Sequence, residues 1–152
     1  MDKKYIKMGV IIILILLLII GAYFIYNSGY IKIGNNNFKI PEGYSIEENE
    51  KYINLTNGTD SICLNKVLGK DIESSVNNYI KLKKSQNLKV NTENYSFNGN
   101  NIIKLYSLNE TNTEHYYFEE NGLTYDIFTC NKNNNTALLV NELIQTKKSA
   151  IL

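Results

Sequence analysis

The sequence predicts an α+β fold, in which an N-terminal transmembrane helix is followed by a mostly antiparallel sheet packed with two helices. Three observations lead to this prediction. Residues 9–26 form a stretch of 18 residues without a charge. Farther along the chain, strand-like segments come in sequence-adjacent pairs, which favours antiparallel pairing. Residues 71–84 and 137–148 change to the 3.6-residue period of a helix.

Residues 9–26 are long enough for a membrane span, because 18 residues at ~1.5 Å each give a helix of roughly 27 Å. A cleaved signal peptide and a buried core helix are the alternatives. The bulky Tyr23 and Phe24 follow the apolar run where a signal peptidase needs small residues. A core helix would show a polar stripe, and this run has none. We therefore expect a retained anchor that contacts the lipid bilayer through residues 9–26.

Lysine placement predicts the orientation of this span. Lys3, Lys4 and Lys7 precede it, and positive residues stay on the cytoplasmic side. We therefore expect a cytoplasmic tail over residues 1–8 and an extracytoplasmic domain beyond the span. The expected localisation is the cell membrane, as a single-pass protein.

The outer part is predicted to begin with a short juncture over residues 27–34 and to continue as one α+β domain over residues 35–152. Alternating residues predict strands, and Asn57-Gly58 suits a hairpin with a loop of two or more residues. The first strands are predicted at residues 30–33, 38–40, 52–55 and 61–64.

The second half of the domain opens with a predicted helix over residues 71–84, for which Asp71 is a suitable N-cap. Strands are then predicted at residues 88–90, 102–108, 115–120 and 123–130. Asn121-Gly122 between the last two is the strongest hairpin signal in the chain. Thr136 is the predicted N-cap of a closing helix over residues 137–148.

A short motif supports this architecture. Phe38-x-Ile40-Pro41-x-Gly43-Tyr44 resembles the first strand of the PsbP/Mog1-like superfamily of small extracytoplasmic domains. The resemblance covers roughly residues 35–150. It implies a mid-chain helix, a long antiparallel meander and a final helix. It also implies kinship with single-span, uncharacterised proteins of methanogenic archaea, but no particular activity, because the members of this group differ widely in function.

Composition excludes several classes of function. All 16 basic residues are lysines, so nucleic-acid recognition by arginine is absent, and residues 27–152 carry 13 Lys against 14 Asp and Glu. No phosphate-binding glycine loop and no nucleophilic-serine motif occurs. We therefore expect no nucleic-acid partner, no cofactor and no metal.

Few residues are candidates for chemistry. His115 is the only histidine, and without a partner motif we interpret it as a strand residue rather than a base or a metal ligand. The acidic residues at 47–50 and 119–120 lie beside predicted turns, where solvated charge is expected. Several of the 12 tyrosines could form a recognition face, but in a chain without tryptophan we interpret them as residues that fill the faces of the sheet.

Two kinds of modification remain open. Cys63 and Cys130 are the only cysteines, and each lies on the less aliphatic side of its predicted strand, so a disulfide is geometrically allowed. Packing of each thiol as a small apolar group is the alternative. Five Asn-x-Ser/Thr sequons make glycosylation chemically feasible outside the cell. They are Asn54, Asn57, Asn94, Asn109 and Asn134.

The sequence therefore predicts a non-enzymatic binding or accessory module at the cell surface, whose partner is an unidentified protein or small ligand. A structural envelope component is the alternative, and a small hydrolase or metalloenzyme is a weaker one. A pocket that joins His115 to two carboxylates would favour the enzyme. Apolar clusters facing solvent on the sheet would favour the binding module.

Overall fold

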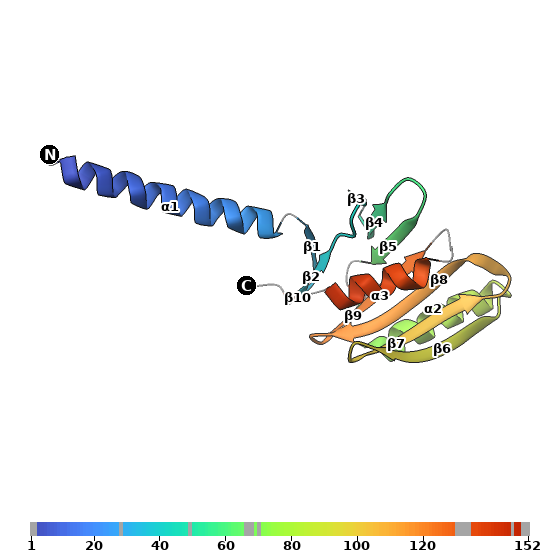
Figure 1. The fold of residues 1–152 in the computed structure, drawn as a ribbon. Helices are drawn as coiled ribbons and strands as arrows, with labels where there is room; N and C mark the ends of the chain where they lie inside the picture. The colour runs from blue at the N-terminus through green and yellow to red at the C-terminus, as the bar shows by residue number, and fades with distance from the viewer. Residues whose placement is uncertain are drawn as a thin grey trace. The chain divides into compact units, whose positions relative to one another are not determined.

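The computed structural model divides the chain into two compact units, Met1–Tyr30 and Ile31–Leu152 (Figure 1). Each unit is described by itself. The structure describes residues 3–27, 29–48, 50–65, 69, 71–129, 135–146 and 148–149.

The first unit contains one helix, α1 (Lys3–Asn27), of 25 residues. Among the described residues, no helix is long and apolar enough to cross a membrane.

This finding contradicts the transmembrane helix predicted over residues 9–26. The single-pass topology, the cell-membrane localisation and the cytoplasmic N-terminus depended on that helix, so they are corrected with it. The α+β class of the remaining chain agrees with the structure.

The second unit is built on a seven-stranded sheet in which every described pairing is antiparallel. Its spatial order is β3-β4-β5-β9-β8-β7-β6. The strands are β3 (Ser45–Glu48), β4 (Tyr52–Thr56), β5 (Ser61–Asn65), β6 (Val90–Phe97), β7 (Asn100–Ser107), β8 (Glu110–Glu120) and β9 (Leu123–Thr129). Pairing of β5 with β9 joins the two halves of the sheet. One half is β3-β4-β5 and the other is β9-β8-β7-β6, and within each half strands that follow one another in sequence pair.

A smaller sheet of three strands has the order β1-β2-β10. It consists of β1 (Tyr30–Ile33), β2 (Asn36–Lys39) and β10 (Lys148–Ser149). Asn36, which is buried, links this sheet to the main one: its amide donates to the Tyr125 hydroxyl at 3.2 Å, and its carbonyl oxygen accepts from Asn121 at 3.0 Å.

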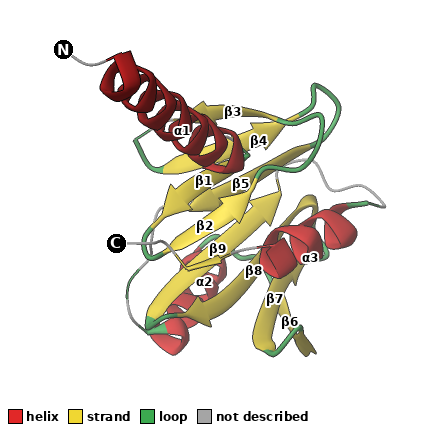
Figure 2. Cartoon of the chain, turned by 60° about the vertical axis from the view of Figure 1, so that its left-hand side comes forward, coloured by secondary structure: helices red, strands yellow, loops and turns green. Residues whose placement is uncertain are grey.

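Two further helices pack on opposite faces of the main sheet, α2 (Ile72–Ser85) and α3 (Thr136–Thr146) (Figure 2). The predicted N-cap of α2 is confirmed, because the Asp71 side chain accepts from the Glu73 backbone N–H. The Glu119 carboxylate accepts from the backbone N–H of Ile72 at 3.1 Å and so ties the start of α2 to β8.

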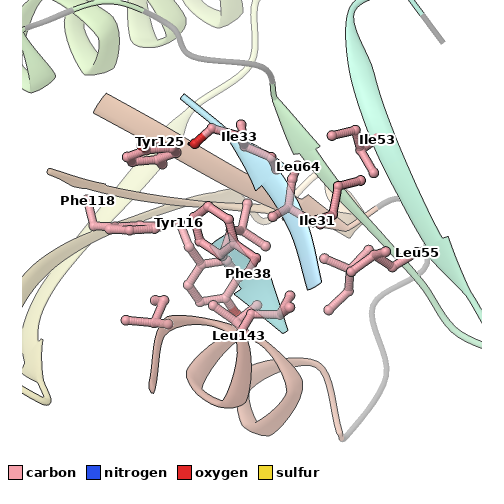
Figure 3. Close-up of a cluster of buried hydrophobic side chains, with 14 of the residues drawn as sticks. Ile31, Ile33, Phe38, Ile53, Leu55, Leu64, Tyr116, Phe118, Tyr125 and Leu143 are labelled. Atoms are coloured by element: carbon pink, nitrogen blue, oxygen red, sulfur yellow. Dashed lines mark hydrogen bonds between the residues drawn. The ribbon is translucent and has the colours of Figure 1, made fainter. Parts of the chain in front are cut away.

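Alternation along the strands produces two separate cores. On the α3 face, Phe38 packs edge-on against Phe118 and Tyr125, with ring centroids 6.4 and 5.4 Å apart. Figure 3 shows this larger core, to which α3 contributes Leu143. On the α2 face, a smaller core contains Val76, Leu105 and Tyr117.

Positive φ angles mark the tight turns. Asn121 and Gly122 have φ of 51° and 71°, so the predicted two-residue hairpin between β8 and β9 is confirmed. Asn98 and Gly99, with φ of 50° and 79°, make an equivalent turn between β6 and β7 that the sequence interpretation missed.

Other differences from the predictions are small. β3 was not predicted, because all four of its residues are exposed and carry no alternation between apolar and polar types. β6 begins at Val90 and continues well past the predicted strand at residues 88–90. α3 already includes Thr136, the residue predicted to precede it.

Candidate functional site: a pocket between α2 and the sheet

A pocket of about 340 Å³ lies between α2 and the sheet. Its lining residues come from one helix and three adjacent strands. The helix contributes Ser75, Asn78, Tyr79 and Leu82, and the sheet contributes Asn65, His115, Tyr117 and Asp126. The helical positions follow the i, i+3, i+4, i+7 spacing of one helix face, so a single stripe of α2 forms the wall over the sheet.

The hairpin between β8 and β9 brings the strand residues together. Its register pairs His115 with Phe128 and Tyr117 with Asp126. Directly opposite residues of an antiparallel pair project from the same face of the sheet. All four side chains therefore face α2, although they lie on two strands and Asp126 is eleven residues beyond His115.

Asp126 is the polar centre of the pocket. Its side chain is 2% exposed, and both carboxylate oxygens lie within hydrogen-bond distance of His115 Nδ1, at 3.0 and 3.1 Å. The Asn65 amide donates to the same carboxylate at 2.7 Å. Burial of a carboxylate costs free energy unless it is paired and hydrogen-bonded, and these two partners offset that cost.

Aromatic rings surround the His115 imidazole. The Phe128 ring stacks on it at 5.1 Å with an interplanar angle of 13°. The Tyr117 ring lies 6.0 Å away at 17°, and the Tyr79 ring from α2 lies 4.4 Å away at 48°. These rings fix the orientation of the imidazole and leave its edge, rather than its faces, open to the pocket.

The second imidazole nitrogen, Nε2, is available for a ligand. Within the described part of the chain, His115 makes its hydrogen bonds through Nδ1. The His115 side chain is 13% exposed. Nε2 is not one of the buried side-chain atoms without a hydrogen-bond partner. Nε2 is therefore accessible to solvent, and it can accept or donate a hydrogen bond.

Tyr117 has a perturbed hydroxyl. Burial, followed by the negative charge of Asp126, raises the pKa of the Tyr117 hydroxyl above its ordinary value of 10.0. The hydroxyl therefore stays neutral over the physiological range. Tyr117 therefore lines the pocket without adding a charge.

A second buried carboxylate lies on the opposite face of the sheet, but its network is closed. Glu114, 3% exposed, accepts from the Tyr116 hydroxyl at 2.6 Å and pairs with Lys104 at 3.1 Å. The Lys104 ammonium also lies 5.2 Å from the centroid of the Tyr106 ring. Since these charges are paired with one another, the cluster is explained by packing of the sheet.

The structure separates the predicted site residues. His115 enters the pocket and is joined to one carboxylate there, not to two. Glu47 and Glu48 are exposed on the edge strand β3, as expected of solvated charges. Among the described residues, no group of three histidine, cysteine or acidic side chains could hold a metal ion.

Cys63 is buried in β5, with its sulfur 3.6 Å from Asn54 Oδ1. β5 pairs with β9, and Phe128 of β9 lies opposite Cys63. Cys130 lies outside the described residues, so the candidate disulfide stays a prediction.

The sequons differ in their surroundings. The Asn54 amide donates to Glu47 at 3.3 Å, and Asn57 Oδ1 accepts two backbone N–H groups, from Thr59 at 2.9 Å and Asp60 at 2.8 Å. Asn94 and Asn109 are exposed. Asn134 lies outside the described residues. Glycosylation at these five positions stays a prediction.

Sequence reasoning missed Asp126, Asn65 and Tyr79 as members of a site. A signal for Asp126 exists. With a two-residue turn at Asn121-Gly122, counting back from the turn pairs residue 117 with residue 126. This pair is two positions from the pair that contains His115, on the same face of the sheet. No comparable local signal exists for Asn65 or Tyr79, which reach the pocket through pairing of β5 with β9 and through docking of α2.

Comparison with known proteins adds little. No family model and no curated protein matches the chain. A solved structure from Bacteroides thetaiotaomicron VPI-5482 is similar at 12% identity and a TM-score of 0.42, covering 76% of this chain and 45% of that one. The chain thus spans less than half the length of that protein. A likeness of this degree carries no argument about fold or function, and the PsbP/Mog1-like resemblance stays an expectation.

Proposed function

We propose that the unit formed by residues 31–152 is a non-enzymatic binding module, and that its ligand is a small molecule held in the pocket between α2 and the sheet. The observation that carries this proposal is the buried Asp126–His115 pair beside a pocket of about 340 Å³. Small-molecule sites are concave, mostly apolar and contain a few fixed polar groups, and typical volumes begin at roughly 300 Å³. The pocket has this composition, with aromatic walls around one oriented imidazole.

Two features support binding over catalysis. Ser75 is the aliphatic hydroxyl in the pocket wall, and it donates to the backbone oxygen of Asp71 at 3.0 Å, as serines inside helices often do. The raised pKa of Tyr117 makes its hydroxyl a poor nucleophile near neutral pH. The pocket therefore contains a candidate base, His115, without an activated nucleophile beside it.

A small hydrolase is the second candidate, because a buried carboxylate that orients an imidazole is also the arrangement of a general base. In that case His115 would activate a water molecule through Nε2. The observation that favours it is the accessibility of Nε2, which a purely structural histidine does not need.

Titration of the full-length chain with small aromatic compounds, followed by two-dimensional NMR, tests the binding proposal. We expect saturable shifts at Tyr79, His115 and Tyr117, with no comparable shifts at Tyr106 on the opposite face. Shifts spread evenly over both faces, or none with any compound, would contradict it.

Hydrolysis of p-nitrophenyl acetate separates the second candidate from the first. The binding module should hydrolyse this ester no faster than its His115→Phe variant. A rate that depends on His115 and saturates with the ester would favour the hydrolase.

A further inference from the structure

The state of His115 restricts the chemistry of the ligand. We infer that the pocket binds a neutral ring compound that donates an O–H or N–H hydrogen bond to His115 Nε2. This inference rests on the proposed binding function and goes one step beyond it, because it names the class of ligand and the atom that recognises it.

The first step concerns the tautomer of His115. Both oxygens of the Asp126 carboxylate lie 3.0–3.1 Å from Nδ1, and a carboxylate can only accept. Nδ1 therefore carries the proton. In the neutral imidazole the other nitrogen, Nε2, is then an acceptor. When the imidazole is neutral, this open nitrogen is therefore suited to a ligand that donates a hydrogen bond.

The second step concerns the charge of the ligand. Within the described residues, Asp126 is the acidic group in the pocket wall, and no lysine lines the pocket. An anionic ligand would meet the Asp126 carboxylate, and the Lys83 ammonium lies over the Tyr79 ring, 5.5 Å from its centroid, rather than beside that carboxylate. A cationic ligand would have to compete with His115 and Asn65 for a carboxylate that both already contact. A neutral ligand avoids both costs.

The third step concerns shape. Tyr79 and Tyr117 line the pocket with aromatic rings, and Leu82, which is 56% exposed, adds an apolar group at the helix wall. Aromatic rings pack well against such surfaces in stacked or edge-on geometry. A volume of about 340 Å³ suits a compound of one or two rings rather than a larger molecule.

Phenol, anisole and benzoate form a matched set of probes for these three steps. Phenol is neutral and donates a hydrogen bond, anisole has the same ring without the donor, and benzoate replaces the donor with a negative charge. Each is titrated into the full-length chain, and the shifts of the pocket residues give its dissociation constant. The His115 side-chain nitrogens are followed in the same samples by ¹⁵N-detected or long-range correlation spectra.

We expect phenol to bind at least tenfold more tightly than either anisole or benzoate, and to shift Nε2 of His115 more than Nδ1. The His115→Phe variant keeps a ring but loses Nε2, so phenol and anisole should bind it equally. Tyr106→Phe removes a hydroxyl on the opposite face and serves as the matched control, with the preference for phenol unchanged.

Several results would overturn the inference. Equal binding of phenol and anisole to the parent chain would show that Nε2 does not accept from the ligand, while leaving the binding proposal intact. Tightest binding of benzoate would contradict the argument from charge. A proton on Nε2 in the free protein, whether or not Nδ1 also carries one, would contradict the inference that Nε2 accepts, and this measurement needs no variant. Absence of pocket shifts with all three probes would overturn the proposed function itself.

Discussion

Removal of the Asp126 carboxylate should destabilise the second unit strongly. Asp126→Ala leaves His115 Nδ1 and the Asn65 amide without their acceptor in a place where the carboxylate is 2% exposed. Each of these two groups, when left unsatisfied, costs about 1–3 kcal/mol, or about 2–6 kcal/mol for the two together. Water entering the pocket would satisfy part of the loss. We therefore expect the free energy of unfolding to fall by about 3 kcal/mol.

Urea unfolding of the full-length chain, monitored by tyrosine fluorescence or circular dichroism, measures this change. Small domains have a total stability of roughly 5–15 kcal/mol, so a loss of this size shifts the midpoint clearly. Glu50→Ala is the matched control, because it also removes a carboxylate but from an exposed position. The control should stay within about 0.5 kcal/mol of the parent.

A double-mutant cycle tests whether the loss comes from the pair itself. His115→Phe removes the imidazole and keeps a ring between Phe128 and Tyr79. If Asp126 and His115 stabilise each other, the double variant should be less destabilised than the sum of the two single variants, with a coupling of about 0.5–3 kcal/mol. An Asp126→Ala variant as stable as Glu50→Ala, or a coupling near zero, would show that the Asp126–His115 pair does not stabilise the unit.

Three further predictions concern other parts of the same unit. Gly122→Val should lower the free energy of unfolding by about 1–3 kcal/mol in a urea titration, because a β-branched residue is strained at a φ of 71°; an unchanged midpoint would contradict the turn geometry. The candidate disulfide between Cys63 and Cys130 requires that no thiol reacts in denatured, unreduced protein, and two reactive thiols would exclude it. Burial raises the pKa of Tyr116 and Tyr117 above 10.0, so the unfolded chain loses these protons at lower pH than the folded chain. The free energy of unfolding should therefore keep its full value below pH 10 and fall above it, by up to ~1.4 kcal/mol per pH unit for each tyrosine. Tyr116→Phe should reduce that slope.

Much of the fold of the second unit is readable from local signals. At Asp71 the spacing of apolar residues changes to the period of a helix, and this residue both caps α2 and marks where the helix begins. Asn121-Gly122 determines the turn type and hence the register of the longest hairpin. β3 could not be found in this way, since an exposed edge strand has no buried face to create alternation. The membrane span predicted over residues 9–26 is wrong, because none of the described helices is long and apolar enough to cross a membrane.

Only part of the candidate site can be predicted from the sequence, because some of its contacts join residues that are far apart along the chain. Hairpin register follows from a two-residue turn, so the approach of Asp126 to His115 is encoded within about a dozen residues. Asn65 joins them only because β5 pairs with β9, across 61 residues of sequence. Its amide would be an ordinary polar end of a strand in any other strand order.

The helical wall of the pocket is still harder to predict from the sequence. Val76 is a core residue of α2, and its burial against Leu105 and Tyr117 places the neighbouring helix turn over His115. This apolar cluster thus fixes the position of Tyr79, and Tyr117 belongs both to the cluster and to the pocket wall. Periodicity predicts that α2 has a buried face, but it does not say which strands that face covers. The pocket exists because a small apolar cluster anchors one part of the helix while polar side chains occupy the next part of the same interface.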